Sequence, residues 1–271
     1  GVIKSMITGL LSILSISKAY LRARLLESTR HWLTLISGLF YPIVKALILI
    51  FLLQAVFHSA TEQQLPVSLN QVAQYIALAA ILNTMIGFNN AFQIAERVKS
   101  GNVAFDLLRP WPWVSMMFGE YLGTKLAAAL FPIAAFLAIS VGLGITLPLA
   151  SYWQLLAMIP CIMLLDFCLT FIIGIATLWT QNTWGLGLAF GWIQMLFSGA
   201  MVPLILLPER LKAIAYWTPF PYLIDAPVSV ALGLETLGRT VQNQLLWSGA
   251  LLCLGLILYR AIIKSLKVNG G

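Results

Sequence analysis

Long stretches of this 271-residue chain contain no charged residue. None lies between Glu62 and Glu96, and 40 consecutive uncharged residues separate Lys125 from Asp166. Only 9% of the chain is charged, whereas a soluble domain carries roughly 25% charged residues. Such a chain cannot cover a folded core with a water-compatible surface. The pattern therefore predicts an all-α membrane protein.

The uncharged stretches are long enough for six membrane crossings, since each crossing takes about 20 residues of helix. Glycine and proline residues in 142–151 divide the longest stretch into two. We expect a single transmembrane domain over residues 1–271. Its crossings are predicted at about 33–57, 72–92, 122–147, 153–179, 186–206 and 243–261.

Two segments outside these crossings have their own patterns. Residues 1–30 repeat apolar side chains near the helical period, with basic residues largely elsewhere, which predicts an amphipathic helix in the membrane interface. Residues 207–239 are apolar but carry prolines at positions 208, 219, 221 and 227, which prevent a continuous helix. We expect two short re-entrant helices there, buried in protein or lining a cavity.

Basic residues are distributed unevenly between the two sides of the predicted domain. If the N-terminus is cytoplasmic, eleven Lys and Arg residues lie inside and three lie outside. This asymmetry predicts cytoplasmic N- and C-termini in a cell membrane, inner or plasma. The net charge of +7 then reflects the basic residues that orient the chain in the membrane, so no nucleic-acid partner is expected.

The sequence shows no catalytic, metal or cofactor pattern. His31 and His58 are far apart without carboxylates or cysteines nearby, and the three cysteines lie in apolar runs. A nucleotide-binding P-loop needs the spacing G-x-x-x-x-G-K-[ST], and "GEYLGTK" (119–125) does not have it. The run "FSGA" (197–200) faintly resembles a membrane serine protease, but no histidine in a crossing is available to Ser198. The chain is therefore not expected to be an enzyme or to hydrolyse ATP.

Three groups of residues resemble the permease subunits of type-2 ABC exporters, and within them the viologen-exporter branch. "ERVKSGNVAFDLLRPWP" (96–112) is similar to the internal segment of that branch. "FSGAMVPLILLPERLKAIAYWTPF" (197–220) and "APVSVALG" (226–233) resemble its external turn and helices. The order of these elements, with the N-terminal helix and six crossings, extends the resemblance over essentially the whole chain.

The resemblance implies a dimer of permeases, identical or homologous, on two ABC ATP-binding subunits. These partner subunits would bind ATP and Mg, and this chain would bind no cofactor. The expected activity is outward movement of hydrophobic or amphiphilic cargo, such as a drug, lipid, glycan or small peptide, with membrane lipid as a further partner.

Residues 96–112 are the predicted ATPase-coupling segment. Their charges suit a polar groove on a partner, and Val103, Phe105, Leu107 and Leu108 supply apolar anchors. From the residues alone, a basic loop that only sets orientation is the favoured alternative, and the resemblance favours coupling instead. The residues assigned to coupling are Glu96, Arg97, Gly101, Asp106, Leu107, Leu108, Arg109 and Pro110. Asp106 and Arg109 are expected at the rim of the contact.

Lys45 and Asp166 lie near mid-depth of their predicted crossings and are a candidate intramembrane pair, since an unpaired charge there is costly. The alternative is that Lys45 reaches a water-filled cleft and Asp166 caps a helix. Glu120 and Lys125 are expected near the inner membrane boundary. Candidate residues for a translocation path are Asn83, Trp192 and Met195, for which helix packing is the alternative.

Two other functions fit a polytopic chain. An ion-coupled secondary carrier would need intramembrane carboxylates, which are scarce here, and inverted repeats, which are not evident. A membrane-embedded lipid-modifying enzyme would need a catalytic set. A cassette ATPase that co-purifies with the chain would separate the exporter from both.

Overall fold

The computed structural model describes residues 13–23, 26, 40, 43–45, 47–49, 51, 69–87, 89–100, 102–108, 112–143, 148–180 and 183–269. Within these ranges every regular element is a helix and none is a strand, which confirms the predicted all-α class. In chain order the labelled helices are α3 (Leu69–Met85), α4 (Asn89–Lys99), α5 (Asn102–Leu107), α6 (Trp113–Leu143), α7 (Leu149–Thr180), α8 (Thr183–Phe197), η2 (Leu204–Leu206), α9 (Glu209–Tyr216), η3 (Phe220–Leu223), α10 (Asp225–Ala231) and α11 (Leu237–Asn269).

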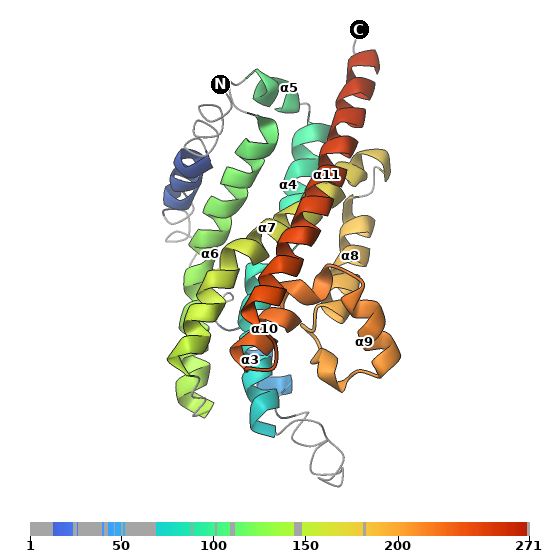
Figure 1. Cartoon of the computed structure of the whole chain (residues 1–271). Helices are drawn as coiled ribbons and strands as arrows, with labels where there is room; N and C mark the ends of the chain where they lie inside the picture. The colour runs from blue at the N-terminus through green and yellow to red at the C-terminus, as the bar shows by residue number, and fades with distance from the viewer. Residues whose placement is uncertain are drawn as a thin grey trace.

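The long helices form an elongated bundle with α7 at its centre (Figure 1). α7 packs against α11, α4, α10 and α8, whereas α3 packs against α6 and α10. The short helices gather in two places. α5 lies at the end of the bundle where α11 also ends, and α9 and α10 lie in the other half (Figure 1).

Close packing between helices depends on small residues at the contacts. A Cβ on Gly174 of α7 would lie 2.8 Å from the Cβ of Ile94 on α4. A Cβ on Gly255 of α11 would lie 2.9 Å from the Phe171 ring of α7. In a bilayer the surrounding lipid is as apolar as the side chains, so close approach of this kind stabilises helix pairs more than exclusion of water does.

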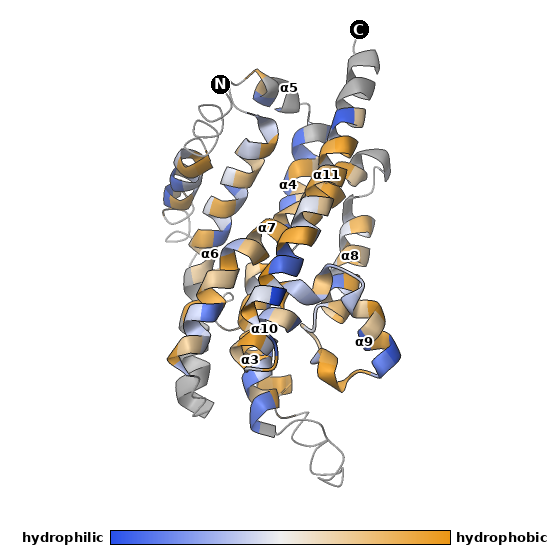
Figure 2. Ribbon diagram, viewed as in Figure 1, coloured by the Kyte–Doolittle hydropathy of each residue, from blue (hydrophilic) through white to orange (hydrophobic). Residues whose placement is uncertain are grey.

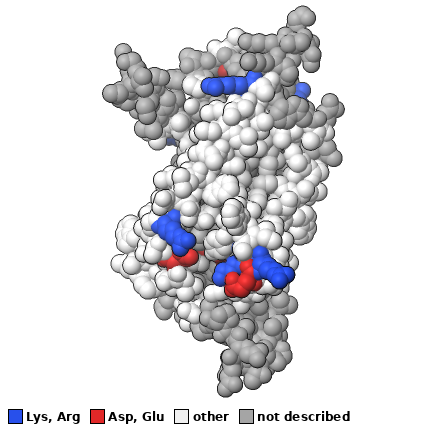
Figure 3. Space-filling model, turned by 45° about the vertical axis from the view of Figure 1, so that its right-hand side comes forward, with Lys and Arg blue, Asp and Glu red and all other residues white. Residues whose placement is uncertain are grey.

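Three of the described helical lengths are long and apolar enough to cross a membrane: Asn70–Arg97, Leu149–Thr177 and Leu237–Ala261. α6 adds a helix of 31 residues. Apolar residues predominate along the bundle (Figure 2). On one face, a broad band without charged residues separates charged residues in the upper part of the view from those in its lower half (Figure 3). These features define an all-helical membrane protein.

Several predicted boundaries differ from those of the structure. The second crossing is divided between α3 and α4, and the fifth ends at Phe197 because the chain turns at residues 198–203 instead of continuing to 206. The sixth begins at Leu237, six residues earlier than predicted. Most of the predicted first crossing and much of 1–30 lie outside the described residues, although 13–23, 43–45 and 47–49 are helical.

Candidate functional site

In its described part, the predicted coupling segment (96–112) consists of the end of α4 and the six-residue helix α5, and α6 begins directly after it at Trp113. Arg97 and Lys99 occupy the last turn of α4, where cations are favoured by the helix dipole. Ser100 closes this helix, because its N–H donates to the Glu96 carbonyl (2.8 Å) and its hydroxyl donates to the Arg97 carbonyl (3.2 Å). The chain then reverses through α5 toward α6.

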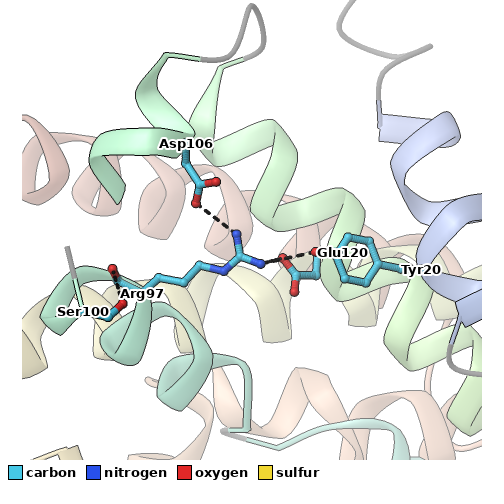
Figure 4. A network of polar contacts seen from close by, with 5 residues as sticks. All are labelled: Tyr20, Arg97, Ser100, Asp106 and Glu120. Carbon is cyan, nitrogen blue, oxygen red and sulfur yellow. Dashed lines mark hydrogen bonds and ion pairs between the residues drawn. The ribbon is translucent and has the colours of Figure 1, made fainter. Parts of the chain in front are cut away.

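Arg97 is the centre of a polar network that joins these helices (Figure 4). Its Nη1 donates to Oδ2 of Asp106 on α5 (3.0 Å). Its Nη2 donates to Oε2 of Glu120 on α6 and to the Tyr20 hydroxyl (3.3 Å) of the helix at 13–23. A guanidinium carries several donors in a fixed plane, so one side chain can hold these groups in a defined geometry. The network therefore fixes α5 relative to its neighbours.

The carboxylates in this network are largely withdrawn from solvent. The side chains of Asp106 and Glu120 are 7% and 11% exposed, and that of Arg97 is 24% exposed. Burial and the nearby Glu120 charge raise the pKa of the Tyr20 hydroxyl, so this tyrosine remains neutral near pH 7. Two carboxylates share one cation, which makes Arg97 the residue on which the arrangement depends.

Large apolar side chains in and next to α5 are exposed, although Asp106 of the same helix is buried. Phe105 is 71% exposed and Leu108, just beyond the helix, is 83% exposed. Polar residues of the same segment are exposed as well: Glu96, Lys99, Ser100 and Asn102. Exposed apolar side chains with exposed polar residues nearby in the chain have the form of an interface face.

Not every predicted coupling residue lies on that face. Asp106 was expected at the rim, but it is buried because it is a counter-ion of Arg97, so that expectation is wrong. Gly101, Arg109 and Pro110 lie outside the described residues. For Leu107 the structure describes only its place in α5.

The N-terminal helix at 13–23 packs along α6 through Gly119 and Gly123. A Cβ on Gly119 would lie 3.0 Å from Ile16, and a Cβ on Gly123 would lie 2.5 Å from the Ser17 carbonyl oxygen. Two small residues spaced four apart are a common helix-contact motif in membranes. The run "GEYLGTK" (119–125), which lacks the spacing of a nucleotide-binding loop, therefore contains a helix-contact motif that the sequence-based prediction did not include.

Asp166 on α7 is paired, but not with Lys45. Its Oδ2 accepts a hydrogen bond from the Tyr121 hydroxyl (2.7 Å) and lies 3.7 Å from Lys125 Nζ, both on α6. Its Oδ1 accepts the Gly87 N–H (3.2 Å) at the break between α3 and α4. Lys125 and Glu120 both form ion pairs within the bundle, and their expected place near the inner membrane boundary stays a prediction.

Lys45 occupies a separate place. Its Nζ is buried and has no hydrogen-bond partner among the described residues. It lines a cavity of about 10 Å³ together with Tyr75, Gly199, Ala200, Met201 and Pro203, among other residues. The predicted Lys45–Asp166 pair is therefore not formed in the structure, because Lys125 takes that role.

The candidate path residues have different environments. Asn83 on α3 is partly buried, and Trp192 on α8 is 66% exposed. Met195, also on α8, packs against the large apolar cluster that contains α3, α7 and α10. These positions do not by themselves define a path, so the role of the three residues stays a prediction.

The other half of the bundle contains a second polar centre, at Asp225. Its Oδ1 accepts hydrogen bonds from the Tyr75 hydroxyl (2.6 Å) and the Leu204 N–H (3.3 Å), and its Oδ2 accepts one from the Tyr216 hydroxyl (2.6 Å). All seven residues of α10 are buried. One carboxylate thus ties α3, η2, α9 and α10 together.

The fold and these polar centres belong to a helical membrane protein, and in its described part no group of three or more metal-ligating side chains occurs. Comparison with family models identifies the class more closely. A model described as "ABC-2 family transporter protein" matches residues 42–270, so the chain belongs to this family. It is thus a transmembrane subunit of an ABC transporter and has an ABC ATP-binding partner. A search of curated proteins finds no match.

Proposed function

We propose that this chain is the permease of an ATP-driven exporter of the viologen-exporter branch and that α5 is its ATPase-coupling helix. The single observation that supports this best is the arrangement of α5. Its position is set internally by the Arg97–Asp106 ion pair, while Phe105 and Leu108 remain exposed. A helix that transmits force to or from a partner must be fixed firmly to its own bundle and must keep apolar side chains exposed for the partner.

The rest of the proposal follows the family and the sequence pattern. The permease has six crossings, with both termini in the cytoplasm, and α5 faces the cytoplasm. Two permease chains, identical or homologous, assemble with two ATP-binding subunits that hold ATP and Mg. The cargo is hydrophobic or amphiphilic and moves outward. In this arrangement α9 and α10 lie toward the outer leaflet, where the buried α10 is re-entrant.

The break between α3 and α4 beside Asp166 is the feature that would favour an ion-coupled carrier, since such carriers use broken helices and intramembrane carboxylates. However, Asp166 is only 1% exposed, and both of its oxygens already accept hydrogen bonds. A carboxylate so occupied is poorly placed to bind and release an ion. Family membership and this geometry therefore favour the ABC transporter over the carrier and the lipid-modifying enzyme.

The proposal is tested by expressing the chain together with candidate ABC ATP-binding subunits from the same genome. We expect one of these subunits to co-purify with the chain, and the ATPase activity of the complex in lipid nanodiscs to change across a panel of amphiphilic drugs, lipids and peptides. A chain that recovers no ATPase, but moves cargo when an ion gradient is applied, would contradict the proposal.

A further inference from the structure

We infer that Gly87 is a hinge within the second membrane-crossing segment and that Asp166 is the side chain that holds it in place. Hydropathy treats Asn70–Arg97 as one apolar length. The structure divides it, because α3 ends at Met85 and α4 begins at Asn89.

The backbone at this break needs a glycine. Ile86 still continues the helix, since its N–H donates to the Leu82 carbonyl (3.3 Å). Gly87 has a φ of 140°, a conformation that side-chain-bearing L-residues rarely adopt. A Cβ there would meet no atom within 4 Å, so the conformation and not a lack of space requires glycine.

Asp166 accepts the hydrogen bond that the Gly87 N–H would make to a backbone carbonyl in a continuous helix. In a continuous helix the Gly87 N–H would donate to the carbonyl of Asn83, four residues earlier. It donates instead to Asp166 Oδ1 (3.2 Å). The other oxygen of this carboxylate contacts Tyr121 and Lys125 of α6. The same side chain thus joins α7, α6 and the break at one level of the bundle.

The two halves of the broken segment pack against different neighbours. α3 packs against α6 and α10, whereas α4 packs against α7, α5 and α8. Asn90 of α4 donates a hydrogen bond to Thr170 of α7 (3.0 Å). A rotation at Gly87 would therefore change the angle between α3 and α4 while each half keeps its own packing.

The hinge connects the two polar centres of the molecule. α4 carries Arg97, which holds α5, and α3 carries Tyr75, which donates to Asp225. A displacement of α5 would move α4 and change its angle, at Gly87, to α3, the helix that carries the Tyr75–Asp225 contact. The proposed coupling role of α5 supplies the cause of this movement, and the hinge itself does not depend on it.

The test measures the distance between spin labels at positions 70 on α3 and 102 on α5, which are both exposed. The permease–ATPase complex is compared without nucleotide and trapped with ATP, in a background with the three cysteines replaced by alanine. Singly labelled variants report any distance between two permease copies. Labels at 239 and 261 on the unbroken helix α11 provide the rigid reference.

We expect the 70–102 distance to change between the two states and the 239–261 distance to stay constant. Gly87→Ala, which disfavours the observed backbone, should reduce that change to about half or less. Gly233→Ala is the matched control, since Gly233 also has a positive φ (74°) and open space around it. An unchanged 70–102 distance in the parent, or a full change in Gly87→Ala, would overturn the hinge.

A second variant covers the case in which Gly87→Ala fails to assemble. The double variant Asp166→Leu/Lys125→Met removes both the ion pair and the acceptor of the Gly87 N–H without leaving a lone buried charge. We expect a broader 70–102 distance distribution in the absence of nucleotide, and an unchanged distribution would overturn the role of Asp166. If Phe105→Asp leaves the nucleotide-dependent change intact, the coupling proposal fails while the hinge stands.

Discussion

Arg97 at the end of α4 holds Asp106, nine residues further along the chain, through an ion pair of 3.0 Å across the turn into α5. The pair is buried on the Asp106 side and partly open on the Arg97 side, with side-chain exposures of 7% and 24%. It turns a six-residue helix, too short to be stable alone, into a fixed part of the bundle.

Replacing Arg97 tests whether its ion pairs fix α5 to the bundle. Arg97→Ala leaves the Asp106 and Glu120 carboxylates buried without their cation, and we expect a loss of about 3 kcal/mol in the free energy of unfolding, the low end for a broken buried pair. Arg97→Lys should lose less, because an ammonium keeps the charge but not the planar fork. Thermal unfolding in detergent measures both.

The matched control for Arg97 is Glu96→Ala, one residue away and exposed on the same helix. A surface change of this kind should stay within about 0.5 kcal/mol. Equal effects at positions 96 and 97 would mean that the network does not stabilise the fold.

Gly123 tests the contact of the N-terminal helix. A Cβ at this position would lie 2.5 Å from the Ser17 carbonyl oxygen, which is backbone and cannot move aside alone. Gly123→Ala should therefore displace the helix at 13–23 and lower the melting temperature. Limited proteolysis within residues 13–23 should become faster.

Gly249→Ala on α11 is the control for this change, since a Cβ there meets nothing within 4 Å. Alanine is favoured over glycine inside a helix by about 1 kcal/mol, so this variant should be neutral or more stable. If Gly123→Ala behaves like Gly249→Ala, the helix at 13–23 does not pack on α6 as described.

The two buried lysines should respond in opposite ways. Lys125→Met leaves Asp166 without its cation and should lower stability by about 3–5 kcal/mol. Lys45→Met removes an ammonium group that has no partner in the described part of the chain, and it should be neutral or stabilising. Double-mutant cycles with Asp166→Asn should show coupling to Lys125 and additivity with Lys45. Coupling between Lys45 and Asp166 would contradict the structure.

Much of the fold can be predicted from the sequence, because a segment that crosses the lipid bilayer must be long, apolar and helical. Uncharged runs of sufficient length predict long helices, and α6, α7 and α11 appear where those runs lie. The prolines between 207 and 239 predict an interrupted segment, and the structure has the short helices α9, η3 and α10 there in place of one long helix. Family membership likewise agrees with the order of motifs.

The polar contacts are not readable in the same way, because they depend on which helices become neighbours. Lys45 and Lys125 are equivalent in the sequence as single lysines near apolar runs, and only the packing of α6 on α7 selects Lys125 for Asp166. Asp106 looks like a surface charge until Arg97 is placed beside it. Two signals were available and missed: the four-residue spacing of Gly119 and Gly123, and Gly87 inside an apolar run.

If the ATPase docks on the exposed apolar side chains next to α5, a photo-crosslinking amino acid at position 108 should capture the ATP-binding subunit. Position 217, after α9, is the control. The native side chains Leu108 and Trp217 are almost equally exposed, at 83% and 84%, and the helices that they follow, α5 and α9, lie in opposite halves of the molecule (Figure 1). We expect capture at 108 and none at 217. Capture at 217, or no capture at 108 in a complex that still co-purifies, would show that the ATPase docks elsewhere.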